Sequence, residues 1–335
     1  MTTYVGESSS DSRCHFRPFT MSAPTITSAS ASAIASASAQ ASARASDEAI
    51  DITPITSSQL LEGLEDQIRK FSGISGLRSA VRTLSKHLYQ ATSSTKNQYL
   101  VLHPVTENDF AEIEDKRFTI NRGLRFTYCT DIDTLIIKVP TPEHERVTRA
   151  FSYDFVDHIR AMGLTDLDDL NDMGATTYKG TSADKEPDSC WRPLAARPNK
   201  QDWPTLVFEV GVSETLRKLR MDARWWLAHS QGRVRIVLLI KINRVARTIH
   251  IEKWECRPAA HTYANRPAAQ VPTEIQTVDI DTHGIVTGSP PATTPPLVLH
   301  FHNLLLRQPI PPEHDVTYTA QHLQGLANDI WTALP

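Results

Sequence analysis

Residues 204–227 read PTLVFEVGVSETLRKLRMDARWWL, and this stretch decides the fold. The apolar run that follows Pro204 has the length and the valine and phenylalanine content of a buried strand. Ser213 then stands where a side chain can cap a helix. One face of that helix is apolar and carries Leu216, Leu219, Ala223, Trp226 and Leu227. The stretch therefore predicts a strand, a sharp turn and a helix.

An acid stands in the middle of this strand, at Glu209. A buried carboxylate is costly unless it is paired or holds a metal ion. Pro187 and Asp188 open a second short strand upstream, so the two strands are expected to form a hairpin whose acids meet on one face. Converging carboxylates supply the hard oxygen ligands that a divalent ion such as Mg²⁺ requires. The sequence therefore predicts a metal site at Asp188 and Glu209.

Composition sets wide limits on function. The 335 residues are 40% hydrophobic with a net charge of −3, enough for one large domain or two small ones. Residues 217–257 hold eleven Lys or Arg against three acids, which suits either a nucleic-acid backbone or a solvated helix face. The four scattered cysteines indicate neither a disulfide framework nor a CxxC metal site, and favour an intracellular protein, cytoplasmic or nuclear. No membrane span is predicted.

The chain is expected to fall into five segments. Residues 1–56 are rich in Ser and Ala and predict a disordered tail rather than an organellar presequence. Two apolar stripes predict a helical hairpin at 57–97. The core follows at 98–257, then a Pro- and Thr-rich, partly disordered insertion at 258–297. A strand and a helix at 298–335 are expected to pack on the core.

Within the core, the sequence predicts a regular series of elements. A helix at 143–162 carries Glu145 in its first turn, where a negative charge suits the helix dipole. The strand predicted at 233–242 is apolar on both faces and is therefore expected to be central. The other predicted strands are 98–102, 124–129, 134–139 and 248–256.

Several short motifs carry a family resemblance. They are TPEH at 141–144, EPD at 186–188, LVFEV at 206–210, WWL at 225–227 and IEKWE at 251–255. In this order they resemble the PD-(D/E)XK nuclease superfamily, and more closely the Uma2-type restriction-endonuclease-like domains and their uncharacterised fungal relatives. The resemblance covers about residues 98–256.

The resemblance implies both a fold and a chemistry. The implied fold class is α/β (α+β), a mixed central sheet flanked by helices with a restriction-endonuclease-like core. The implied reaction is phosphodiester hydrolysis, with Asp188 and Glu209 holding Mg²⁺ or Mn²⁺ and Glu145 assisting the metal shell. In such a site the metal activates a water molecule and polarises the phosphate.

The chain departs from the family pattern at one position. The superfamily places a lysine two residues after the acid of the strand, and this chain has Gly211 there. Lys218, on the following helix, is the candidate catalytic cation, although an i,i+4 pair with Glu214 explains it equally simply. Lys241 and Lys253 on neighbouring strands are the fallback candidates.

Two further cations and two tryptophans complete the set of candidates. Arg220 and Arg224 are candidates for nucleic-acid binding because a guanidinium neutralises a phosphate. Trp225 is expected to be half-exposed, where it can stack a base, and Trp226 to lie in the core.

Three readings of the site stay open. Retention of both acids favours a metal-dependent nuclease. The glycine at the lysine position favours a catalytically inactive module of the same fold that binds nucleic acid or protein. In the third reading Glu209 is purely structural and pairs with Arg220 or Arg224.

Overall fold

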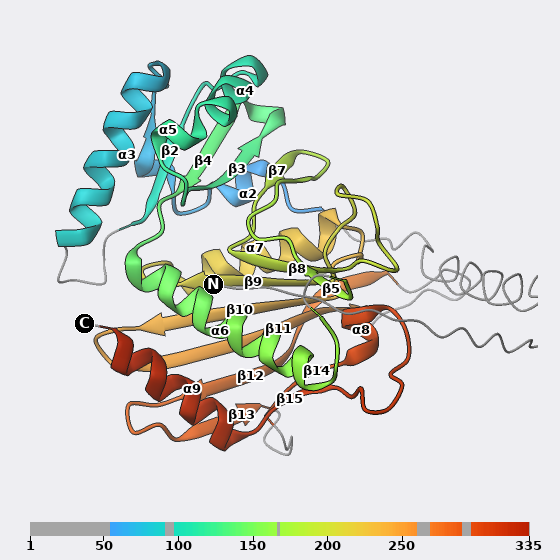
Figure 1. Ribbon diagram of the computed structural model, residues 1–335. Coiled ribbons are helices and arrows are strands. Elements are labelled where there is room, and N and C mark those ends of the chain that lie inside the picture. The colour runs from blue at the N-terminus through green and yellow to red at the C-terminus, as the bar shows by residue number, and fades with distance from the viewer. Residues whose placement is uncertain (1–53, 91–96, 166–167, 260–268, 290–295, 335) are drawn as a thin grey trace, which may run out of the picture. The chain divides into compact units, whose positions relative to one another are not determined.

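The computed structural model describes residues 54–90, 97–165, 168–259, 269–289 and 296–334 (Figure 1). These residues belong to one compact unit. The predicted disordered tail lies outside the described residues up to residue 53. Among the described residues, no helix is long and apolar enough to cross a membrane.

A seven-stranded mixed sheet forms the larger half of this unit. Its strand order is β13-β12-β11-β10-β9-β8-β5; only β9 and β10 run parallel, and the other pairs are antiparallel. The strands are β5 (Leu170–Asp172), β8 (Ser189–Pro193), β9 (Leu206–Gly211), β10 (Ile236–Asn243), β11 (Thr248–Pro258), β12 (Gln270–Ile280) and β13 (Val286–Ser289). The predicted mixed sheet and the central place of β10 are confirmed.

A six-stranded sheet stands beside it and was not anticipated as a separate layer. Its order is β1-β2-β4-β3-β7-β6. The strands are β1 (Ile68–Arg69), β2 (Tyr99–Leu102), β3 (Arg125–Cys129), β4 (Thr134–Lys138), β6 (Tyr178–Lys179) and β7 (Ala183–Lys185). Helices α3 (Gly73–Gln90), α4 (Glu107–Asp115) and α5 (Arg117–Ile120) accompany it. The strands predicted at 124–129 and 134–139 are β3 and β4, which pair antiparallel in this sheet.

Helix α7 (Leu216–His229) joins β9 to β10 and lies between the two sheets. Its core neighbours are Val207 and Val237 from one sheet and Val101 and Ile136 from the other. Because the helix is covered on two sides, Trp225 is buried like Trp226, and the prediction of a half-exposed Trp225 is wrong. The N-cap is Thr215 rather than Ser213, since its hydroxyl accepts from the Lys218 amide.

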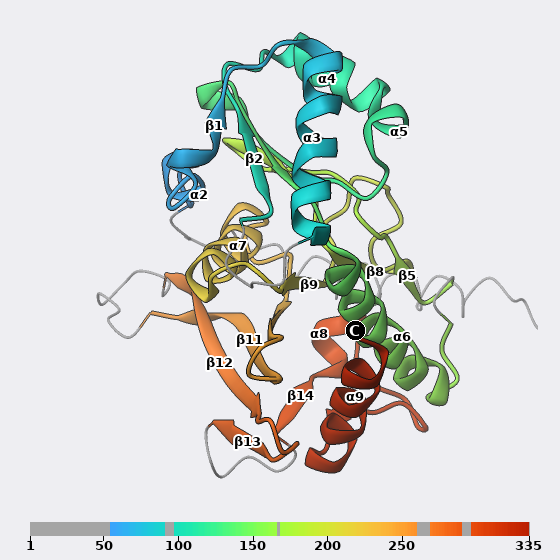
Figure 2. The same cartoon turned by 90° about the vertical axis from the view of Figure 1, so that its left-hand side faces the viewer.

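The opposite face of the seven-stranded sheet is covered by α6 (Pro142–Ala161) and α9 (Ala320–Ala333) (Figure 2). Alternate residues of β9 divide between the two faces: Phe208 packs under α6, whereas Val207 packs under α7. Because successive side chains of β9 point to opposite faces and both faces are covered by helices, the strand is apolar at nearly every position.

Three segments differ from the sequence-based prediction. The first half of the predicted helical hairpin holds only α2 (Ser57–Leu60), the 3₁₀ turn η1 (Glu65–Gln67) and β1. The predicted insertion contains β12, which pairs along most of β11, together with β13; residues 260–268 and 290–295 lie outside the described part. The final strand and helix begin elsewhere than expected: β14 is Leu297–Leu299, α8 is Phe301–Leu305, β15 is Val316–Tyr318, and α9 follows.

Candidate active site

The candidate site lies where the chain crosses from one sheet to the other. Strand β7 belongs to the six-stranded sheet and β8 to the seven-stranded sheet, so residues 186–188 form the crossing. Glu186 fixes it, because this carboxylate accepts hydrogen bonds from the Phe126 amide at 2.9 Å and from the Arg117 guanidinium at 2.7 Å. The crossing delivers Asp188 to the end of β8 and next to β9.

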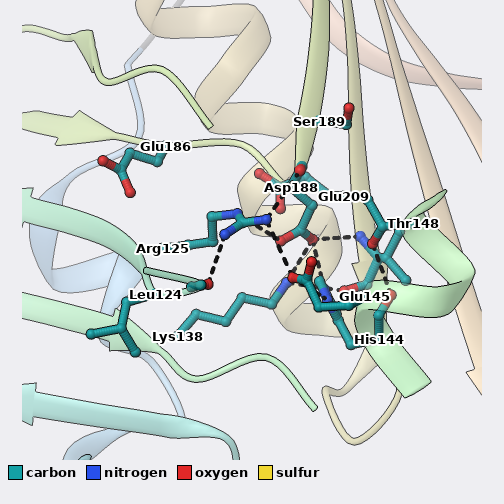
Figure 3. A network of polar contacts seen from close by, with 12 residues as sticks. Leu124, Arg125, Lys138, His144, Glu145, Thr148, Glu186, Asp188, Ser189 and Glu209 are labelled. Carbon is teal, nitrogen blue, oxygen red and sulfur yellow. Dashed lines mark hydrogen bonds and ion pairs between the residues drawn. The ribbon is translucent and has the colours of Figure 1, made fainter. Parts of the chain in front are cut away.

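Asp188 is completely buried among cations (Figure 3). Its Oδ2 atom lies 2.8 Å from Nζ of Lys138 and 3.0 Å from Nε2 of His144, and it accepts from the Val210 amide at 2.8 Å. Burial alone would raise the pKa of the Asp188 carboxyl, but His144 and Lys138 hold this pKa well below its usual value. Asp188 is therefore ionised at neutral pH.

Glu209 faces Asp188 across the strand pair. The register pairs Ser189 with Phe208, so one further step places Asp188 opposite Glu209. Oε1 of Glu209 accepts from the Trp226 indole at 2.6 Å and lies 3.2 Å from Nζ of Lys185. Burial raises the pKa of Glu209 to about 7; Lys185 opposes this shift, and the nearby charge of Asp188 adds to it.

Two buried lysines lie among the acids, and each pairs with a different two of them. Lys138, the last residue of β4, contacts Asp188, and its Nζ lies 2.9 Å from Oε1 of Glu214. Lys185, the last residue of β7, contacts Glu209 and lies 3.3 Å from Oδ1 of Asp222. Each lysine amine therefore sits between two carboxylates, which outweighs the cost of burying it and raises its pKa.

Glu145 lies at the more open side of these ion pairs. Its side chain is 29% exposed, and its Oε1 lies 3.3 Å from Nη2 of Arg125 and 3.7 Å from Nδ1 of His144. Although burial alone would raise the pKa of Glu145, the His144 and Arg125 contacts lower it. Arg125 also faces Asp188, with its Nε 3.9 Å from Oδ1. Glu145 and Asp188 therefore share Arg125 and His144, whereas Glu209 pairs with Lys185.

The predicted catalytic lysine has a different partner from the one expected. Nζ of Lys218 lies 2.8 Å from Oδ1 of Asp222, one helical turn further along α7, rather than against Glu214. Glu214 instead receives hydrogen bonds from Tyr99 and Gln98. The i,i+4 pair with Glu214 was therefore a wrong prediction; Lys218 pairs with Asp222 and lies over the Tyr99 ring at 5.6 Å.

The geometry also explains the glycine at the lysine position of the family pattern. A Cβ atom on Gly211 would lie 2.7 Å from Cδ1 of Leu219 and 3.3 Å from Cβ of Glu214. A side chain at position 211 would therefore have to displace the buried Leu219 side chain of α7. Nζ of the fallback Lys241 bonds the carbonyl of Val212, and that of Lys253 bonds the carbonyl of Val298.

Arg220 and Arg224 contact residues other than Glu209. Arg220 donates from Nε to both carboxylate oxygens of Glu252, at 3.0 and 3.1 Å, and Arg224 lies over the Trp254 ring at 5.8 Å. A structural ion pair between Glu209 and either arginine was therefore a wrong prediction; the cation at Glu209 is Lys185. The predicted role of Arg220 and Arg224 in nucleic-acid binding stays a prediction.

The Arg220–Glu252 pair gives a test of stability against pH. Burial opposes ionisation of Glu252, but hydrogen bonds from His250, Arg220 and Trp254 lower its pKa to about 2. Because this folded-state pKa lies below the ordinary value of 4.5, the stabilisation is present above that value and is lost as the pH falls toward 2. We expect Glu252→Gln to cost about 2 kcal/mol at pH 6 and progressively less in urea titrations at lower pH. A constant difference from wild type between pH 6 and pH 2.5 would contradict this.

Sequence reasoning missed the cations that pair with the acids, namely Lys138, Lys185 and the buried His144, and it missed the further acid Asp222. One signal was present, because His144 belongs to the TPEH motif. The lysines gave none, since each ends a strand of the other sheet and meets the acids only through the tertiary fold.

Comparison with known proteins gives distant similarity to solved structures alone. No protein-family model matches the chain, and no curated protein matches it. A solved structure described as a putative nuclease belonging to DUF820 from Anabaena variabilis ATCC 29413 is similar at a TM-score of 0.36 and 12% identity. The match covers 67% of this chain and 99% of that one. A similarity of this size does not identify a function, so the predicted family stays a prediction.

Proposed function

We propose that this chain is a metal-dependent nuclease that hydrolyses phosphodiester bonds, with Asp188 and Glu209 as the ligands of Mg²⁺ or Mn²⁺. The observation that carries the proposal is the register of β8 and β9, which sets these two buried acids opposite each other. Glu145 shares Arg125 with Asp188 and supplies a third, more exposed carboxylate.

The donor set fits a hard divalent ion. All three acids offer oxygen ligands, as Mg²⁺ and Mn²⁺ prefer. Oδ1 of Asp188 is enclosed and receives no hydrogen bond from the described residues; its nearest cation there is Nε of Arg125, at an ion-pair distance of 3.9 Å. An unsatisfied buried carboxylate oxygen is costly, and a cation at this atom removes that cost.

Each residue then has a role that follows from its contacts. A bound divalent ion polarises a phosphate and lowers the pKa of a bound water. His144 and the Val210 amide hold Asp188 in its orientation and keep it ionised. Lys185 stays protonated beside Glu209 and is the candidate for offsetting negative charge that develops on the phosphate.

One observation favours the inactive module as the second candidate. The amines of Lys138 and Lys185 already neutralise Asp188 and Glu209, and an ammonium so placed competes with a metal ion for the same oxygens. In that case these ion pairs stabilise the fold, and the basic segment of residues 217–257 binds a partner without catalysis.

Metal titration separates the two candidates. We expect calorimetry to show saturable Mn²⁺ binding to the wild type that both Asp188→Asn and Glu209→Gln abolish. Asp184→Asn, an acid on β7 that half-faces solvent, is the matched control and keeps the binding. Nicking of plasmid DNA and cleavage of single-stranded DNA and RNA are measured on the same proteins. Unchanged Mn²⁺ binding in either variant removes this site, and binding without cleavage favours the inactive module.

A further inference from the structure

A second cluster of ligand-type side chains lies between α6 and α9, away from the candidate active site. Asp154 and His158 are one turn apart on α6 and therefore share a face. His322 stands in the first turn of α9, where the Thr319 hydroxyl caps its amide. Among the described residues, these three form the one group of His, Cys, Asp or Glu side chains whose ligand atoms all lie within 4.8 Å of one another.

The contacts gather these side chains around the Asp154 carboxylate. Nε2 of His322 lies 2.7 Å from Oδ1 of Asp154, and Nδ1 of His158 lies 3.6 Å from Oδ2. Oδ2 of Asp154 is enclosed; the Asp154 carboxylate also interacts with the buried Tyr318 hydroxyl, whose pKa is raised by burial first and by Asp154 second. The same Nδ1 of His158 lies 3.0 Å from the carbonyl of Asp154.

That last contact decides which nitrogen of His158 is available. A carbonyl oxygen only accepts, so Nδ1 must be the protonated nitrogen and Nε2 carries the lone pair. A histidine that ligates a metal typically donates its other ring N–H to a backbone carbonyl or a carboxylate. His158 therefore already has the tautomer that a metal ligand needs.

The cluster of Asp154, His158 and His322 is buried on one side and exposed to solvent on the other. Tyr318 is buried beneath the cluster, with its ring 4.9 Å from that of His158 and 5.5 Å from that of His322. The side chains of Asp154 and His158 are 18% and 17% exposed, whereas that of His322 is 36% exposed. An ion thus has an entry side at His322, and water can complete its shell there.

We propose that Asp154, His158 and His322 bind one divalent transition-metal ion, with Zn²⁺ as the best match. Two imidazole nitrogens and one carboxylate oxygen suit Zn²⁺ better than Mg²⁺. Tetrahedral zinc places its ligand atoms about 3.3 Å apart, so rotations of three side chains on packed helices are sufficient. The ion replaces the His322–Asp154 hydrogen bond and fastens the C-terminal helix to α6.

Zinc titration of the chelator-stripped full chain tests this proposal. We expect one Zn²⁺ per chain by calorimetry, a rise in the thermal unfolding midpoint, and a tetrahedral Co²⁺ absorption spectrum. Both His158→Ala and His322→Ala are expected to weaken Zn²⁺ binding more than about tenfold. His302→Ala is the matched control, because His302 stacks on another histidine, His300, in α8.

The remaining outcomes are separable. Asp188→Asn is expected to keep full Zn²⁺ binding, so loss of the nuclease proposal would leave this one standing. Circular dichroism in chelator shows whether each variant folds; should an alanine variant fail, His322→Gln keeps a polar contact with Asp154 at a partly exposed position. An absence of saturable Zn²⁺ binding, or equal affinity in wild type and both histidine variants, overturns the proposal and leaves an ordinary hydrogen-bonded cluster.

Discussion

Lys138→Met is expected to lower the free energy of unfolding by about 3–5 kcal/mol, because it removes the ammonium that the buried carboxylates of Asp188 and Glu214 share. Lys138 is 5% exposed, and its Nζ contacts Asp188 at 2.8 Å, Glu214 at 2.9 Å and the Val210 carbonyl at 3.0 Å. Methionine fills the space of the aliphatic stem, so the loss reports charge rather than packing. Urea denaturation of both proteins measures the difference.

The matched control is Lys241→Met. Nζ of Lys241 donates to the Val212 carbonyl at 2.6 Å and is paired with no carboxylate in the described structure, so about 1 kcal/mol or less is expected. The double variant Lys138→Met/Glu214→Gln removes one of the two stranded charges and is expected to recover at least about 1 kcal/mol relative to Lys138→Met. A single variant within about 1 kcal/mol of wild type would show that His144 and the Val210 amide suffice for Asp188.

The sequence predicted the half of the fold whose patterns are local. Strand β10 was recognisable because it is apolar on both faces, and α6 and α7 because their apolar residues recur at helical spacing. The separation into two sheets was not predictable in this way. It depends on α7 being covered from both sides, a long-range contact that leaves no periodic signal beyond one extra buried tryptophan, Trp225.

The same limit applies to the candidate site. Asp188 and Glu209 were identified because an acid in or beside an apolar strand is conspicuous in the sequence. Their cations were not, because a lysine at the end of a strand is usually solvated, and only tertiary structure shows that Lys138 and Lys185 point inward. The first lysine after Gly211 in the sequence is Lys218, which is connected to Glu209 through Asp222 and Lys185.

Lys185→Met is expected to lower the turnover of phosphodiester cleavage by about 10²–10³-fold at saturating metal, the cost of losing one preorganised positive group near developing charge. This expectation rests on the proposed nuclease function. Metal binding itself is expected to persist, because Asp188 and Glu209 both remain. Loss of Lys185 is expected to raise the pKa of Glu209 further. Cleavage is therefore measured at saturating Mn²⁺, which offsets this rise.

We expect Lys185→Met to lower the free energy of unfolding by less than Lys138→Met does, because the partners of Lys185 are easier to satisfy without it. Asp222 keeps Lys218 at 2.8 Å, and Glu209, whose pKa is already about 7, becomes neutral at low cost. Lys116→Met, at an exposed lysine paired with Asp115, is the control for nonspecific charge effects. Lys218→Met is the decisive comparison: if it costs more turnover than Lys185→Met, the catalytic cation is the lysine that the sequence suggested, acting across Asp222, and the assignment to Lys185 fails.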